Sequence, residues 1–581
     1  MSQALQAPGF AALAPGRAVE TRMVGGRWQA VAWDLGTGRR RVVTDRPHGV
    51  DLSEIEPDGA HLWWFDADTS GEGRWRRQPF TDGGPVEALT GLPRGRAYGL
   101  AFDRAGSRAA VGIGVGGASH CYLGEPGGAG RLVGTAPGYL SLADLSPDGR
   151  LLALGGRPDG PDAVLLWPTD PPGSAPVRLP GGSGLRLWPI EFRPQDGPDP
   201  ELLLIAELNE QYTVAIWRAD RGLRPHPRLA FASEISVGWY GGARGVLVQQ
   251  EQDGRSRLLA VDLDADWDGP REIPTPGGTI HDLSCAPDGT LHCLWSRTTV
   301  PPRPLLIPPG GLSADQVSPT VNSPHPGQRW TSGPAGPIHS FVSTPPGPGP
   351  WPTLFLVHGG PATHDRDSYD PSVGALVRHG YAVVRTNYRG STGYGARWQR
   401  EFGHRVGLAQ LEDLAAVRAA LVDEGVADPG RTGLCGFSWG GYLTLLGLGA
   451  QPQLWSLGMA AHPIADYPAV YRATTPALRV IDQELFGGTP QEVPERYRAA
   501  SPLSYVQQVR SPVLLVVSEA DERCPAEQVT RYAKELARLA VPHELFWTDG
   551  GHRSRLAADH DAVFAAMLRF AAHCWPTPPP P

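Results

Sequence analysis

The stretch from Leu434 to Tyr442, LCGFSWGGY, runs from an apolar segment into a serine that is set between glycines. Gly436, Ser438 and Gly440 match the pattern G-x-S-x-G, which forms a sharp turn between a strand and a helix and exposes a nucleophilic serine. Ordinary strand-helix turns also produce so short a pattern. It predicts a nucleophile only if a strand precedes it, a helix follows it and its catalytic partners come later in the chain.

The residues after position 328 alternate short apolar runs with helical patterns. The apolar runs predict strands at 353–357, 381–387, 431–436, 456–461, 512–517 and 543–547. Apolar residues recur at helical spacing within 408–425 and 526–540. Strands that alternate with helices of this length predict a mostly parallel, doubly wound sheet. Ser438 would then lie at the carboxyl edge of that sheet, where such folds bind ligands.

A serine hydroxyl becomes a good nucleophile when a histidine takes its proton and an acid orients that histidine. In this fold the three groups follow the chain order Ser, Asp, His. Asp521 and His552 each come just after a predicted strand. The sequence therefore predicts Ser438, Asp521 and His552 as a catalytic triad. Other acids near these positions are alternatives for the middle place: Glu519, Glu522 and Asp549.

Acyl transfer also needs hydrogen-bond donors that face the negative oxygen of the tetrahedral intermediate. The segment from His358 to Pro361, HGGP, directly follows the strand predicted at 353–357. A glycine loop at this place can turn a backbone N–H toward the site. We predict the backbone N–H groups of Gly360 and Trp439 as the two donors, with a plain tight turn as the alternative reading of HGGP.

The first half of the chain repeats a turn flanked by alternating apolar runs. The turns lie at Gly59, Gly106, Gly149, Gly197, Gly242 and Gly289, and the differences between these numbers are 47, 43, 48, 45 and 47. A repeat in the forties with hairpin turns predicts the four-stranded blades of a β-propeller. Residues 31–44 predict a seventh blade. The even spacing favours a propeller over a pair of β-sandwiches.

Residues 301–328 are rich in proline and predict the crossing between two domains. We expect an N-terminal extension at 1–20, a β-propeller of about seven blades at 21–325 and an α/β-hydrolase domain with a doubly wound, mostly parallel sheet at 326–581. A chain of 581 residues is long enough for at least two such domains.

Composition narrows the partners and the compartment. The net charge of -8 argues against nucleic acid or an anionic membrane as a partner. No run is long enough to span a membrane, and the first residues lack the pattern of a secretory signal. The six cysteines fit no metal or disulfide spacing, so we expect free thiols in a reducing cytoplasm and no metal: Cys121, Cys285, Cys293, Cys435, Cys524 and Cys574. The chemistry requires no organic cofactor.

Motifs in the second half resemble the prolyl oligopeptidase family of serine peptidases. They are LVHGGP, NYRGSTGYG at 387–395, GFSWGGY, ELFGGTPQEVPERYRAASPLSYV at 484–506, ADERCP and GGH. HGGP is similar to the acylaminoacyl peptidases, whereas the oligopeptidases proper have tyrosine in place of His358. The resemblance implies a propeller that caps the hydrolase, N-terminal residues that pack on the hydrolase, and short peptides as substrates. It leaves a homo-oligomer open.

The resemblance also implies that Arg523 binds a substrate carbonyl on the acyl side, although an arginine paired with a neighbouring acid is the alternative. Arg553 and Arg555 follow the predicted catalytic histidine and could bind a carboxy terminus, or simply lie in a solvated loop. No adjacent pair of glutamates occurs before Pro301, which argues against a dipeptidyl peptidase. Four aromatic residues predict either a substrate pocket or core packing: Phe437, Trp439, Tyr442 and Phe486.

The sequence thus predicts a serine peptidase that works through an acyl-enzyme, of the acylaminoacyl peptidase type. A dipeptidyl peptidase or a carboxypeptidase-type member of the same family is the nearest alternative. A carboxylesterase would share the triad and the glycine loop. A noncatalytic propeller scaffold would explain the repeats but gives no reason for the three triad residues to occur together.

Overall fold

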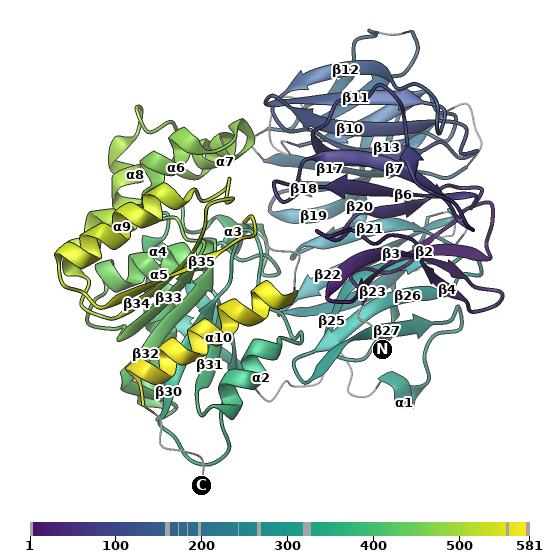
Figure 1. The fold of residues 1–581 in the computed structure, drawn as a ribbon. Coiled ribbons are helices and arrows are strands. Elements are labelled where there is room, and N and C mark those ends of the chain that lie inside the picture. The colour runs from purple at the N-terminus through teal and green to yellow at the C-terminus, as the bar shows by residue number, and fades with distance from the viewer. Residues whose placement is uncertain are drawn as a thin grey trace. The chain divides into compact units, whose positions relative to one another are not determined.

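The computed structural model describes residues 4–156, 163–171, 173–182, 184–195, 199–241, 243–263, 269–317, 327–552 and 557–576 (Figure 1). The chain divides into two compact units, Met1–Asn322 and Ser323–Pro581. The domain boundary predicted between residues 325 and 326 lies outside the described residues, so its place stays a prediction. Among the described helices, none combines the length and the apolar character of a membrane span.

The first unit is a seven-bladed β-propeller, which confirms the architecture predicted from the repeats. Its described residues form seven antiparallel sheets, of which six have four strands and the last has three. The first four sheets are β1 to β4 (Gly9–Phe10, Arg17–Val24, Arg27–Asp34, Arg40–Val42), β5 to β8 (Ser53–Ile55, His61–Ala67, Gly73–Pro79, Val86–Glu87), β9 to β12 (Arg96–Phe102, Ala109–Val115, Ala118–Gly124, Arg131–Pro137) and β13 to β16 (Ser141–Leu145, Leu151–Gly155, Val164–Pro168, Val177–Leu179).

The remaining three sheets continue in chain order. They are β17 to β20 (Leu185–Phe192, Glu201–Leu208, Gln211–Arg218, Gly222–Phe231), β21 to β24 (Ile235–Tyr240, Gly245–Gln252, Arg255–Asp262, Arg271–Ile273) and β25 to β27 (Thr279–Cys285, Leu291–Arg297, Val300–Ile307). A short helix, α1 (Ala314–Val317), follows the last sheet.

Four of the repeated glycines occupy the same turn in their blades. Gly59, Gly106, Gly149 and Gly289 each join the first and second strands of a sheet, with φ between 69° and 85°. Only glycine adopts this backbone region readily, which is why the repeat is visible in the sequence. The turns predicted at Gly197 and Gly242 fall on residues outside the described ranges.

Carboxylates on the first strands join one blade to the next. Asp144 of β13 accepts the backbone N–H of Phe192 at 2.7 Å, and Glu191 of β17 accepts that of Trp239 at 2.7 Å. Each acceptor lies one blade before its donor, and the strands concerned, β13, β17 and β21, lie side by side. Burial raises the pKa of Asp144 to about 7, and it also raises the pKa of Glu191.

Arginines make a second set of contacts between blades, at the glycine turns. Each guanidinium donates to a backbone carbonyl in the turn of the following blade: Arg17 to Gly59 at 2.9 Å, Arg108 to Gly149 at 3.3 Å, and Arg193 to Ala243 at 2.7 Å. Because the acceptor is a turn carbonyl, these bonds depend on the positive-φ backbone at Gly59, Gly149 and Ala243.

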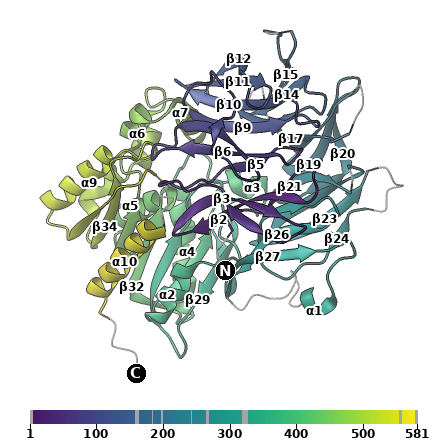
Figure 2. The same ribbon diagram turned by 45° about the vertical axis from the view of Figure 1, so that its right-hand side comes forward.

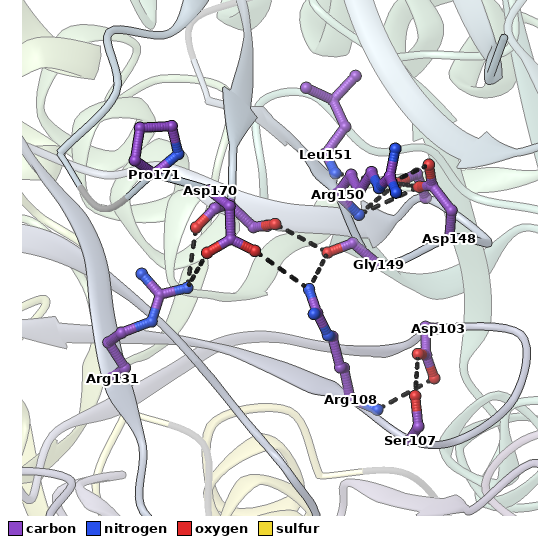
Figure 3. Close-up of polar contacts among 12 residues, drawn as sticks. Asp103, Ser107, Arg108, Arg131, Asp148, Gly149, Arg150, Leu151, Asp170 and Pro171 are labelled. Atoms are coloured by element: carbon purple, nitrogen blue, oxygen red, sulfur yellow. Dashed lines mark hydrogen bonds and ion pairs between the residues drawn. The ribbon is translucent and has the colours of Figure 1, made fainter. Parts of the chain in front are cut away.

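Two arginines and a carboxylate join the third and fourth blades (Figure 3). Arg108 and Arg131 both pair with Asp170, at 3.4 and 3.3 Å, and Arg131 also donates to the carbonyl of Thr169 at 2.8 Å. These side chains line a surface pocket of about 410 Å³. The two guanidinium groups share one carboxylate at this pocket, and these ion pairs join the two blades.

The N-terminal segment joins the first blade to the last. β1 pairs with β2, and the backbone N–H of Ala7 donates to Asp282 of β25 at 2.8 Å. Phe10 packs on His292 of β26, with ring centroids 4.9 Å apart, and both views show β2 and β3 beside β26 (Figures 1 and 2). The extension predicted at 1–20 therefore differs from the structure, since β1 and part of β2 belong to the first sheet.

The crossing between the two units begins later than the predicted residue 301. Residues 301–307 lie in β27, which pairs only with β26 and is the edge of its sheet. Proline lacks a backbone N–H, so an edge strand tolerates it where a central strand would not.

The second unit is a mostly parallel sheet between helices, which confirms the predicted α/β-hydrolase fold. Its eight strands, in sheet order, are β28 (Gln328–Gly333), β29 (Gly336–Ser343), β31 (Ala382–Asn387), β30 (Trp351–Val357), β32 (Ala427–Phe437), β33 (Leu457–Ala461), β34 (Val513–Ser518) and β35 (His543–Thr548). The pairs from β31 through β35 are parallel, and β28 and β29 add an antiparallel edge. The six predicted strands correspond to β30 through β35.

Helices cover both faces of this sheet. They are α2 (Pro371–Arg378), α3 (Ala396–Arg400), α4 (Leu408–Asp423), α5 (Trp439–Ala450), α6 (Tyr467–Ala473), α7 (Pro476–Phe486), α8 (Pro494–Ala500), α9 (Ala526–Arg538) and α10 (Ala557–Cys574). The larger core cluster joins one face to α4, α5 and α9. The other face packs on α2 and α10 through residues such as Leu376 and Phe570.

The raised pKa of Asp144 predicts a pH-dependent stability. Its pKa of about 7 in the folded protein lies above the ordinary value of 3.8, so the fold favours the protonated acid. That contribution is complete below pH 4 and is lost as the pH rises to about 7. Asp144→Asn keeps a hydrogen-bond acceptor but removes the charge. The melting temperature of this variant minus that of the wild type should therefore rise by about 2 °C or more from pH 5.5 to pH 8.

Thermal unfolding followed by circular dichroism measures this difference. Asp45→Asn, whose side chain is 96% exposed, is the control and should show no such gain. An equal difference at both pH values for Asp144→Asn would contradict the prediction.

Candidate active site

Ser438 lies at a strained turn between β32 and α5. Its backbone has φ 56° and ψ -115°, a region that residues other than glycine rarely adopt. The chain passes so close to itself that a Cβ at Gly436 would lie 2.3 Å from a backbone atom of Gly440. A Cβ at Gly440 would lie 1.9 Å from the carbonyl oxygen of Val357. The two glycines are therefore needed for this turn to form.

The structure brings the three predicted triad residues together. His552 Nε2 lies 2.9 Å from Ser438 Oγ, and His552 Nδ1 lies 2.9 Å from Asp521 Oδ2. Asp521 follows β34 and His552 follows β35. With Nδ1 donating to the carboxylate, Nε2 has a free lone pair for the serine proton. The alternative acids, which are Glu519, Glu522 and Asp549, are exposed.

Asp521 is held in place by four donors. Its carboxylate accepts backbone N–H groups from Arg523 at 2.9 Å and Cys524 at 2.8 Å, besides the two histidines His462 and His552. Burial on its own would raise the pKa of this carboxyl, but the hydrogen bonds from the histidines hold it well below its usual range. Asp521 therefore stays ionised at neutral pH.

His462 is a member of the site that the sequence analysis missed. Its Nδ1 lies 3.1 Å from Asp521 Oδ2, and its ring is 5.9 Å from that of His552. The residue has φ 48° and is buried. It follows β33, at the same sheet edge as the triad. That position, a histidine directly after a predicted strand, was the signal available in the sequence.

The same three side chains form the one group of potential metal ligands found among the described residues. The ligand atoms of His462, Asp521 and His552 lie within 4.8 Å of one another. Two N–H···O hydrogen bonds to a shared carboxylate account for this convergence.

The glycine loop after β30 is fixed by His358. The His358 ring stacks on Tyr388 with centroids 4.2 Å apart, its Nε2 lies 2.9 Å from Ser391 Oγ, and Tyr388 donates to the His358 carbonyl at 2.7 Å. Burial lowers the pKa of His358 to about 4, so the ring is neutral. Gly360 in this loop has φ 135°.

The second predicted donor is Trp439, the first residue of α5. The backbone N–H groups of the first helical turn have no partner within the helix. They also carry the positive end of the helix dipole, which favours a developing negative charge. The roles of the Gly360 and Trp439 backbone N–H groups as donors to the negative oxygen of the intermediate stay predictions.

The motif at 387–395 holds the glycine loop after β30 in place. Arg389 forms a buried ion pair with Asp413 of α4 at 2.9 Å and a second with Glu412 at 3.0 Å. Asn387 accepts the backbone N–H of Asp365 at 2.7 Å and thereby ties the segment after the glycine loop to β31. The motif is therefore a scaffold for the loop.

The remaining predicted residues have different outcomes. Arg523 is exposed on the turn after Asp521, and Arg553 and Arg555 lie outside the described residues. Phe437 packs on the rings of His462 and His552, with centroids 5.2 Å away in both cases. The other three aromatic residues, Trp439, Tyr442 and Phe486, are buried in the core cluster of the second unit.

This arrangement agrees with the comparison to known protein families. Residues 368–576 match the sequence profile of the prolyl oligopeptidase family. They belong to that family of serine peptidases. The resemblance predicted from the motifs is thus confirmed.

One relative matches more of the chain than the family domain does. The acylamino-acid-releasing enzyme of Rattus norvegicus is 25% identical over 371 residues, which cover 59% of this chain and 50% of that protein. The chain therefore spans about half the length of this curated relative.

Two solved structures share the fold of almost the whole chain. Pyrococcus horikoshii acylaminoacyl peptidase has a TM-score of 0.73 at 18% identity and is matched over 98% of this chain and 94% of its own. A Mycobacterium tuberculosis puromycin-hydrolyzing peptidase has a TM-score of 0.81 at 21% identity, over 98% and 95%. At these identities the likeness establishes the fold, a propeller together with an α/β-hydrolase.

The close approach at Gly440 gives a direct test of the turn. Gly440→Ala puts a methyl group against the carbonyl of Val357, so the turn must shift and carry Ser438 with it. We expect labelling of Ser438 by a fluorophosphonate probe to slow by about 100-fold or more. Gly374→Ala in α2 is the control, because its added methyl meets only the end of Arg378. Unchanged labelling of Gly440→Ala would contradict the prediction.

The bond from His462 to Asp521 gives a second test. His462→Ala removes a donor to an ionised carboxylate, a bond typically worth about 1.5–3 kcal/mol, so kcat/KM should fall by about 10-fold. His462→Asn retains an N–H donor and tolerates the positive φ, so it should restore most of the activity. The measurement is kcat/KM together with the melting temperature. Equal loss in both variants would show that the hydrogen bond is not what matters.

Proposed function

We propose that this chain is a serine peptidase of the acylaminoacyl peptidase type, which hydrolyses short peptides through an acyl-enzyme. The observation that supports this most directly is the line of hydrogen bonds from Ser438 through His552 to Asp521. The strained turn at Ser438 and the family of residues 368–576 support the same function. So do the acylamino-acid-releasing enzymes among its relatives.

In the first half of the reaction, Ser438 Oγ attacks the carbonyl carbon of the scissile bond while His552 Nε2 takes the serine proton. A bond forms between Oγ and the carbon, and the carbonyl oxygen becomes negative. Asp521 keeps the histidine ring in the correct tautomer and stabilises its positive charge. We assign the backbone N–H groups of Gly360 and Trp439 as donors to the negative oxygen.

In the second half, the carbon–nitrogen bond breaks and His552 gives its proton to the leaving amine. Water then attacks the acyl-enzyme, with His552 first taking a proton from the water and then returning one to Ser438 Oγ. Apart from the substrate and the attacking water, every group in these steps comes from the chain. Both halves use the same donors, because the same oxygen becomes negative twice.

Two arginines are proposed as contacts to the substrate. The exposed guanidinium of Arg523 follows Asp521 by two residues and is suited to bind a carbonyl on the acyl side. Arg553 is the candidate for a carboxylate at the other end of the peptide. The six free cysteines fit a protein of a reducing compartment, and we propose the cytoplasm.

One peptide series tests the function. A single sequence is prepared with a free, an acetylated or an amidated end, and the products are identified by mass spectrometry. We expect release of the acetylated amino acid from the blocked peptide. Ser438→Ala should lower kcat by about 10⁶-fold, since the nucleophile is lost. Ser504→Ala, a substitution of an exposed serine in the same unit, should have no effect.

Other products would identify the alternatives. Dipeptides from the free amino end would identify a dipeptidyl peptidase. A strict need for a free carboxylate would favour a carboxypeptidase and Arg553. Hydrolysis of p-nitrophenyl esters without peptide cleavage would identify a carboxylesterase, and full activity of Ser438→Ala would overturn the proposed mechanism.

A further inference from the structure

Gln528 of α9 is a buried amide that contacts two of the turns at the active-site edge of the sheet. The residue is 3% exposed. Its Nε2 donates to the carbonyls of Pro463 and Pro525, at 2.9 and 3.1 Å. Its Oε1 accepts the backbone N–H groups of Ala465 and Asp466. The amide therefore uses both of its N–H groups and both acceptor positions of its oxygen.

The four partners also fix which way the amide of Gln528 points. Carbonyl groups only accept hydrogen bonds and backbone N–H groups only donate them, so the reversed amide would mismatch all four contacts. A side chain without an amide would leave the four backbone groups without this partner. Such unpaired groups are rare inside folded proteins. The contact therefore requires an amide of this length.

The two turns that Gln528 joins carry two residues that share a hydrogen bond. One turn follows β33 and begins at His462, and the other follows β34 and runs from Asp521 to Pro525. His462 Nδ1 lies 3.1 Å from Asp521 Oδ2. Three of the four contacts of Gln528 are to the turn of His462, and the fourth is to the turn of Asp521.

The backbone at His462 needs such support. Its φ of 48° is uncommon for a residue other than glycine, and a proline, here Pro463, restricts the residue before it to extended conformations. Strained conformations persist only when the surrounding structure holds them. The backbone N–H of His462 donates to the carbonyl of Val516 at 2.8 Å, which holds the chain before the strained residue. Gln528 holds the segment after it, residues 463–466.

The rest of the triad has a separate support. Ser518, at the end of β34, donates to the carbonyl of Gly550 and accepts the backbone N–H of Ala520 at 3.1 Å. This buried hydroxyl thus joins the turn that carries Asp521 to the turn that carries His552. The pairing of these two triad residues therefore has a support that does not involve α9.

We propose that Gln528 is a positioning residue of the peptidase, which holds the strained turn at His462 and so directs His462 at the carboxylate of Asp521. This inference rests on the proposed function. Gln528 acts through His462 and does not contact the substrate. Loss of its amide should therefore slow the chemical step and leave substrate binding unchanged. It should have little effect where His462 is already absent, because both changes then break the same contact.

Two variants of the full-length protein remove the amide. Gln528→Met keeps the length of the side chain, whereas Gln528→Ala leaves room for water to hydrate the four backbone groups and tests the inference if the methionine variant does not fold. With an acetylated peptide as substrate, we expect kcat to fall by about 10-fold and KM to change by less than about 2-fold. Labelling of Ser438 by the fluorophosphonate probe should slow by the same factor.

A double-mutant cycle tests the route of the effect. In the background of His462→Ala, the change Gln528→Met should lower kcat by only about 2-fold or less. A further fall of about 10-fold would overturn the inference, because Gln528 would then act by a route other than His462.

Gln451→Met is the matched control. The Nε2 of Gln451 donates to the carbonyl of Leu411 at 3.2 Å, and its Oε1 accepts the indole N–H of Trp455 at 3.1 Å. Gln451 follows the last residue of α5, at the opposite end of that helix from Ser438. We expect this variant to melt at a lower temperature, as the Gln528 variants should, but to keep the kcat of the wild type.

The outcomes separate this inference from the proposed function. An unchanged kcat in a folded Gln528 variant would overturn the inference and leave the peptidase intact. An equal fall of kcat in Gln451→Met would also overturn it, since lower stability would then account for both results. If the wild type cleaves no peptide but Ser438 is labelled, the proposed function fails and the labelling rates still decide the inference. If Ser438 takes no probe either, both fail.

Discussion

The geometry of the candidate active site depends on one close contact of the backbone with itself. Gly440 lies so near the end of β30 that no side chain fits between them, and this contact sets the first turn of α5 directly behind Ser438. The turn costs conformational energy, since Ser438 holds a positive φ. The packed sheet and helices stabilise that conformation. This turn places the serine hydroxyl at the carboxyl edge of the sheet, with Ser438 Oγ 2.9 Å from His552 Nε2.

A second constraint is electrostatic and centres on Asp521. An isolated carboxylate is costly to bury, but this one accepts four hydrogen bonds, two from the backbone and two from histidines. Asp482 of α7 accepts no hydrogen bond from the described residues, and burial raises its pKa to about 7. Two acids of the second unit thus differ in pKa because of the donors around them.

The propeller shows how a repeat in the sequence relates to contacts between blades. The positive-φ glycines made the blades predictable, because few other residues fit those turns. The contacts that join the blades were not predictable. Asp144 and Asp282 accept backbone N–H groups from other blades, and nothing in the local sequence of a strand identifies its neighbour in the ring. The same reason explains why the predicted extension at 1–20 differs from the structure, since β1 and β2 pair within the first sheet.

The sequence by itself determined the two folds, the strands β30 to β35 and the chain order of the predicted triad, because each of these leaves a local pattern of period, glycine or spacing. Only the tertiary structure decided that His462 and His552 share the carboxylate of Asp521. That arrangement depends on side chains that come from separate elements and meet at one edge of the sheet. Hydrogen bonding and burial are properties of that meeting, and a linear sequence carries no signal for them beyond the position of each residue after its strand or within its helix.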